Sequence, residues 1–137
     1  MSIMFFIAPF DPKAWEDPED FTPKPTSDLR IEPSEYHQKL VERWPKISFI
    51  HWFPTGWELP PESEYPSGLR GWLQKNQQIV SFGKGPTKSF IDFILWHRSI
   101  IPEQYPLFLF NSSSWDSLLL TKDTTEQDIV DFTGIIN

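Results

Sequence analysis

Large apolar side chains are concentrated in one stretch near the middle of the chain, from Ser89 to Ile101. Eight of its thirteen residues are Phe, Ile, Leu or Trp, and at about 100° per residue they cover most of a helix circumference. Only a narrow polar stripe through Lys88, Asp92 and Ser99 interrupts them. Because a helix that is apolar nearly all round belongs in a protein interior, the pattern predicts a buried central helix over about 87–101. The stretch is too short and too polar to span a membrane.

The rest of the hydrophobic pattern predicts short strands and two further helices. Helical spacing after Pro33 indicates a helix over 33–44, and a threonine cap with early acids indicates a closing helix that ends before Gly134. Runs of strand-forming residues predict the strands, at 2–8, 47–53, 69–74, 78–82, 107–111 and 118–121. The order β-α-β-β-β-α-β-β-α then predicts an α+β fold, with a mixed or mainly antiparallel sheet packed on the buried central helix.

The length predicts a single globular domain over 1–137. Two proline-rich segments, about 9–32 and 52–68, show no regular periodicity, and we expect both to be irregular. Long irregular segments are uncommon in a compact domain unless they have a function. The strands at 69–74 and 78–82 are expected to form a hairpin, whose turn uses the tolerance of Asn76 for a left-handed conformation.

The formal net charge of −7 is distributed unevenly along the chain. Residues 11–35 hold eight acids and three bases, residues 36–102 hold five acids and eight bases, and residues 103–137 hold six acids and one base. An acidic protein repels nucleic acid and anionic lipid and attracts basic partners. We therefore expect no binding to nucleic acid or membrane, and a basic protein partner. The alternative interpretation is that the charge only keeps the protein soluble.

The sequence contains no cysteine, which excludes disulfides, thiolate metal sites and a cysteine nucleophile, and which is typical of a cytoplasmic protein. The three histidines, His37, His51 and His97, fall on separate predicted elements without the i, i+4 spacing of a helical zinc site. We predict no metal, no cofactor and no catalytic residue, and we favour a protein that is not an enzyme.

The segment 52–68 is the predicted protein interface. Aromatic rings beside glutamates are typical of interaction hot spots, in which a ring anchors the partner and charges select it. The predicted interface residues are Trp52, Trp57, Glu58, Glu62, Glu64 and Tyr65. A module that neutralises a basic partner, such as an immunity protein bound to a toxin domain, is one concrete version of this function. The alternative interpretation is a stiff loop whose rings cover the edge of the hairpin.

A second hypothesis is a small-molecule or anion site, or a small enzyme, with a pocket near residues 83–98. Lysines flank the predicted start of the central helix, where free backbone N–H groups can hold an anion. The predicted anion ligands are Lys84, Gly85, Thr87 and Lys88, and Asp92 with either His97 or Arg98 would complete a pocket. The spacing does not match a phosphate-binding loop, so an ordinary turn with solvated lysines is the alternative interpretation. A purely structural role as a subunit is a third possibility, and the sequence does not predict the oligomeric state.

Overall fold

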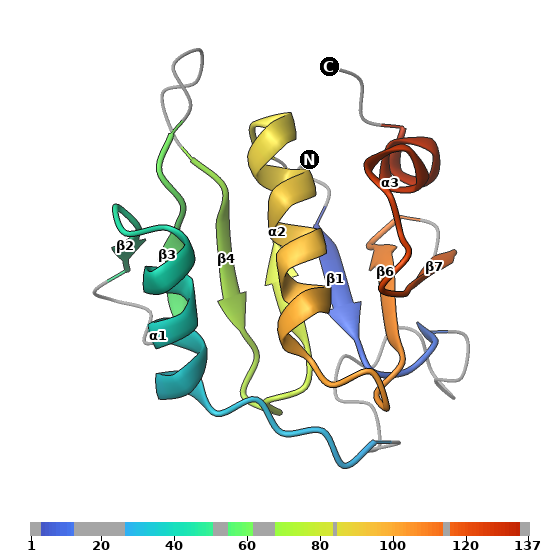
Figure 1. The fold of residues 1–137 in the computed structure, drawn as a ribbon, viewed down its shortest axis with the longest axis horizontal. Coiled ribbons are helices and arrows are strands. Elements are labelled where there is room, and N and C mark those ends of the chain that lie inside the picture. The colour runs from blue at the N-terminus through green and yellow to red at the C-terminus, as the bar shows by residue number, and fades with distance from the viewer. Residues whose placement is uncertain are drawn as a thin grey trace.

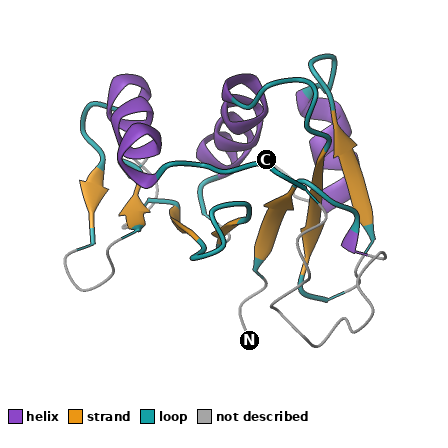
Figure 2. Cartoon of the chain, turned by 90° about the horizontal axis from the view of Figure 1, so that it is seen from below, coloured by secondary structure: helices purple, strands orange, loops and turns teal. Residues whose placement is uncertain are grey.

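The computed structural model describes residues 4–12, 27–50, 55–61, 68–83, 85–113 and 116–134. This part of the chain forms a single antiparallel sheet with the strand order β2-β3-β4-β5-β1-β6-β7. Three helices cover one face of this sheet (Figures 1 and 2). The strands are β1 Phe5–Ala8, β2 Ser48–Phe49, β3 Gly56–Glu58, β4 Arg70–Leu73, β5 Val80–Phe82, β6 Leu107–Asn111 and β7 Ser117–Leu120. The predicted α+β class is confirmed.

The helices begin and end where local chemistry allows. Helix α1, Pro33–Arg43, starts with proline at its first position, and the Glu32 side chain accepts the Glu35 N–H. Helix α3, Glu126–Thr133, has a capping box between Thr125 and Asp128, and it ends at Gly134 with φ 71°, as predicted. Helix α2, Thr87–Ile100, has no side-chain cap, because Pro86 occupies its N-cap position.

Strand β3 corrects the prediction that 52–68 is irregular throughout. Gly56–Glu58 pairs with β2 on one side and β4 on the other, which adds a strand to the predicted order. Single-sequence patterns miss such a strand because three residues are too few to show alternation. The remaining strands and helices lie at the predicted places; β6 has the predicted bounds, β7 lies one residue earlier, and most of the others are shorter. Residues 2–3 and 51–53 of the predicted strands lie outside the described residues.

The β4–β5 turn differs from the prediction in one respect. The left-handed residue is Gln77, with φ 59°, and not Asn76. Asn76 instead uses its side-chain oxygen to accept the N–H groups of Gln78 and Ile79. A short polar side chain can replace a backbone acceptor in a turn. Asn76 therefore stabilises the hairpin through its side chain and does not adopt the left-handed backbone conformation.

Helix α2 lies against the middle of the sheet, as predicted (Figure 1). Lys88 and Ser99 are exposed and Asp92 is half-buried, so the predicted polar stripe faces outward. At the centre of the opposite face Phe93 is completely buried among aromatic rings, namely those of Trp44, Trp57, Phe82, Trp96 and His97. The far face of the sheet carries a smaller buried cluster of Phe6, Ala8, Phe10, Ile79 and Phe110. Strand β1 contributes to both faces because its side chains alternate.

In the described ranges, none of the helices combines enough length with enough apolar character to cross a bilayer.

We expect Phe93→Ala to reduce the free energy of unfolding by about 3–5 kcal/mol, because it leaves a cavity where several rings meet. Phe93→Leu should cost less, because it retains most of the buried volume. Urea denaturation measures both, with Ser99→Ala on the exposed side of the same helix as the control. A loss below about 1 kcal/mol for Phe93→Ala would show that α2 is not the centre of the core.

Candidate functional site

Trp57, the predicted aromatic anchor of the interface, is 0% exposed. The prediction that it is available to a partner is wrong. Its ring lies between Tyr36 and Phe93, with both centroids 5.7 Å away. Gly71, directly opposite Trp57 in β4, makes room for the ring, because a Cβ there would lie 2.9 Å from it. Because β3 is a strand, its central side chain points toward the helices and becomes part of the core.

Glu58, the second described residue of the predicted interface, is half-buried and forms an ion pair with Arg70. The two residues lie directly opposite each other in β3 and β4, and opposite charges in this position stabilise a strand pair. The other predicted interface residues, Trp52, Glu62, Glu64 and Tyr65, lie outside the described residues, so their role stays a prediction.

The predicted anion site surrounds the beginning of α2. Thr87 is the first helical residue and Lys88 is exposed, whereas Gly85 approaches Leu69 so closely that a Cβ would lie 3.0 Å from it. Gly85 therefore has a packing role. Lys84 lies outside the described residues. Anion binding at this helix start stays a prediction from the sequence.

The most unusual polar contact in the core joins two helices. The Tyr36 hydroxyl of α1 and Nδ1 of His97 in α2 lie 2.8 Å apart, and the two side chains are 2% and 0% exposed. Within the described residues, Nε2 of His97 and Nε1 of Trp57 are also buried, and neither has a hydrogen-bond partner. If Tyr36 donates to Nδ1, only the Nε2 proton of the pair lacks an acceptor. That tautomer leaves fewest groups unpaired.

Burial and, to a smaller extent, the neighbouring Arg98 charge together lower the pKa of His97 to about 3. Burial also raises the pKa of Tyr36 well above its usual value. Both side chains are therefore neutral at neutral pH. A general base must reach the proton of a bound substrate, whereas His97 is enclosed by rings and bonded to Tyr36. The contact stabilises the packing of α1 on α2.

The other two polar residues of the hypothetical pocket in α2 point to different neighbours. Asp92 lies 3.7 Å from Arg43 of α1, so it pairs with the first helix. Arg98 is 7% exposed and donates to four backbone carbonyl oxygens, those of Ile101, Pro102, Tyr105 and Leu120. The structure does not bring Asp92, His97 and Arg98 together into one site.

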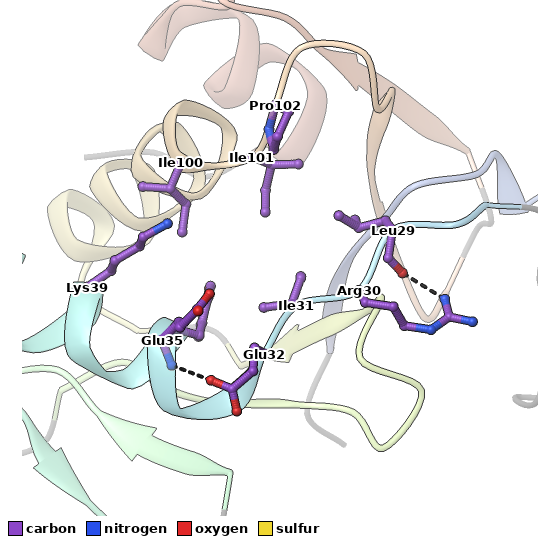
Figure 3. A pocket seen from close by; sticks show the side chains of 10 residues that line it. Leu29, Arg30, Ile31, Glu32, Glu35, Lys39, Ile100, Ile101 and Pro102 are labelled. Carbon is purple, nitrogen blue, oxygen red and sulfur yellow. Dashed lines mark hydrogen bonds between the residues drawn. The ribbon is translucent and has the colours of Figure 1, made fainter.

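A pocket of about 120 Å³ lies where the start of α1 faces the end of α2 (Figure 3). Ile31, Ile100 and Ile101 point into it, while Lys39 extends across its mouth toward α2 (Figure 3). The Glu32 carboxylate is already bonded to the Glu35 N–H at the helix start, and this bond lowers its pKa. The pocket is a small depression between two helix ends, lined by both apolar and charged residues.

A larger pocket of about 370 Å³ lies beside β7, at the edge of the sheet. Leu119 and Leu120 of β7 line it, together with Glu103, Gln104 and Pro106 from the connection between α2 and β6. Leu119 is 49% exposed, more than Val41 or Phe49, the other exposed large hydrophobic residues of the described part. Arg98 lies at the base of the pocket, and Lys122 and Asp123 lie on its rim.

Sequence reasoning did not identify this edge as a candidate. The run Leu118–Leu120 and the acidic character of the final third were both visible in the sequence. The strand order was not visible in the sequence. Whether a strand lies at the edge depends on which strands pair, and hydrophobic patterns do not specify the partner of each strand. Only the register of β6 with β7 shows that the exposed side chain of Leu119 belongs to the last strand of the sheet.

Comparison with known proteins gives no relatives: no family model, curated protein or solved structure matches this chain. Within the described ranges, no three His, Asp or Glu side chains gather in a way that could hold a metal ion.

We expect His97 to make the protein less stable in mild acid. Its pKa is lower in the folded chain than the ordinary value of 6.5, so the unfolded chain binds the extra proton. Stability is therefore lost as the pH falls below about 6.5, by about 2 kcal/mol between pH 7 and pH 5. Urea denaturation at both pH values compares the protein with His97→Gln, which keeps a polar group but does not titrate. Equal losses in the two proteins would contradict this assignment.

Proposed function

We propose that this chain is a non-catalytic protein-binding module that receives a basic protein partner. The observation that carries the proposal is the charge of the exposed surface over residues 103–134. Six carboxylates in this part are exposed, together with one lysine. They are Glu103, Asp116, Asp123, Glu126, Asp128 and Asp131, and the lysine is Lys122.

Such a surface attracts cationic proteins and accelerates their association. Asp128 also accepts a hydrogen bond from the N–H of Thr125, the N-cap residue of α3, and Asp131 accepts one from Gln127. Each bond fixes the position of one carboxylate oxygen. The negative charge is therefore held in place by the helix that carries it.

The described polar residues of the core support the same proposal, because they bond to other groups of the fold. His97 is neutral and bonded to Tyr36, and the guanidinium of Arg98 is occupied by carbonyl oxygens. Neither side chain is placed to act on a substrate. An immunity-like protein that blocks a basic toxin domain is one form of this function, and it rests on size and charge alone.

We expect a stoichiometric complex between the purified protein and a purified basic partner, and its dissociation constant should rise at least tenfold between about 50 and 500 mM salt. The partner is first isolated by affinity capture at low salt and then reconstituted from pure components for calorimetry. Binding that is insensitive to salt, or the absence of any basic protein that binds directly, would contradict the proposal.

A further inference from the structure

Strand β7 is an apolar strand at the edge of the sheet. Its sequence, Ser117–Leu120, contains no proline and no charged residue, and its ladder partner is β6. Edge strands expose unpaired N–H and C=O groups, and natural proteins usually protect them with charges, prolines or covering segments. At the opposite edge β2 is only two residues long, and the Phe49 ring contacts His37 with centroids 4.8 Å apart. The β7 edge is therefore the longer template for an incoming strand.

The pocket beside β7 adds side-chain specificity to this edge. Its volume of about 370 Å³ lies within the range of ligand-binding clefts. The walls combine the apolar side chains of Leu119 and Pro106 with the carboxylates of Glu103 and Asp123. A lysine or arginine side chain matches such a wall, because its methylene stem packs on apolar surface while its charged end pairs with a carboxylate.

The charges around β7 favour a basic segment over the other segments that could pair with this strand. Asp116 precedes β7 and Asp123 follows it, so both ends of the strand carry negative charge. A second copy of this chain carries the same net negative charge, so it is repelled where a basic segment is attracted. An acidic segment would meet the same repulsion. A segment with alternating basic and apolar residues would present apolar side chains on one face and bases on the other.

The positive groups of the pocket fit the same occupant. The donors of Arg98 are directed at backbone carbonyls, including that of Leu120 at 3.4 Å, so the guanidinium serves the fold. Lys122 is then the one exposed base among the described residues from 103 onward. It marks a position at which the incoming segment should carry no base.

We infer that the β7 edge and its pocket bind an extended lysine- or arginine-rich segment of another protein by adding that segment to the sheet as a strand. This inference rests on the proposed function and names the surface that contacts the basic partner. Backbone hydrogen bonds along β7 supply affinity, and the carboxylates around the pocket select for basic side chains.

A peptide of about ten residues in which lysine and valine alternate is the probe. We expect it to shift the backbone amide resonances of Ser117–Leu120 and of the pocket rim, and to leave Ser48–Phe49 unchanged. The double variant Glu103→Gln/Asp123→Asn should weaken binding at least about fivefold, and Lys122→Glu should strengthen it. The control Asp28→Asn/Glu42→Gln changes the net charge equally at exposed residues that do not line the pocket, and it should bind nearly as the unmodified protein does.

Two further peptides test the mode of binding. A glutamate–valine peptide should not bind, and methylation of alternate backbone nitrogens in the lysine–valine peptide should abolish binding without changing its charge. Equal binding of either peptide, or resonance shifts confined to another surface, would overturn the inference. If a purified basic partner binds but the β7 amides do not shift, the inference fails and the proposed function stands. If no basic polypeptide binds, both fail.

Discussion

The guanidinium of Arg98 is the contact on which the arrangement around β7 depends. Burying a charge is costly unless it is fully hydrogen-bonded, and here four carbonyl oxygens surround it at 2.8–3.4 Å. Three of these oxygens belong to the chain that leaves α2, and the fourth belongs to Leu120 at the end of β7. One side chain thus joins the end of the central helix to the start of β6 and to the edge strand. The larger pocket is enclosed by the same segments.

The described polar groups of the core serve packing. Tyr36 and His97 connect α1 to α2 by a buried hydrogen bond, and Trp57 fills the space beside them at the level of β3. A charged imidazole would be unstable in this aromatic surrounding, which is why burial lowers its pKa so far. Acidic residues, by contrast, occupy exposed positions around β7 and α3. The division fits a protein that binds through its surface charge and an exposed strand.

Most of the fold could be predicted from the sequence, because its strongest signals are local. The apolar run of α2, the apolar run that ends at Asn111 and the Thr125–Gly134 helix signals each act within a few residues. The candidate site could not be predicted in this way, because its position depends on which strands pair with each other. From the sequence, Trp57 is expected to be an exposed ring among prolines and glutamates, whereas pairing of β3 on both sides buries it. The exposure of Leu119 likewise cannot be predicted without knowing that β7 is an edge strand. Tertiary pairing decides both exposures.

The central claim is that Arg98 holds β7 and its pocket in position, and amide hydrogen exchange in Arg98→Met tests it most directly. Methionine keeps much of the apolar stem but leaves the carbonyls without their donor, so global stability should fall by at least about 2 kcal/mol. Amides of β7 should also lose more protection than those of β1, and Arg98→Lys should fall between the two proteins because it keeps the charge without the planar fork. Unchanged protection in β7, or full stability of Arg98→Met, would contradict the claim.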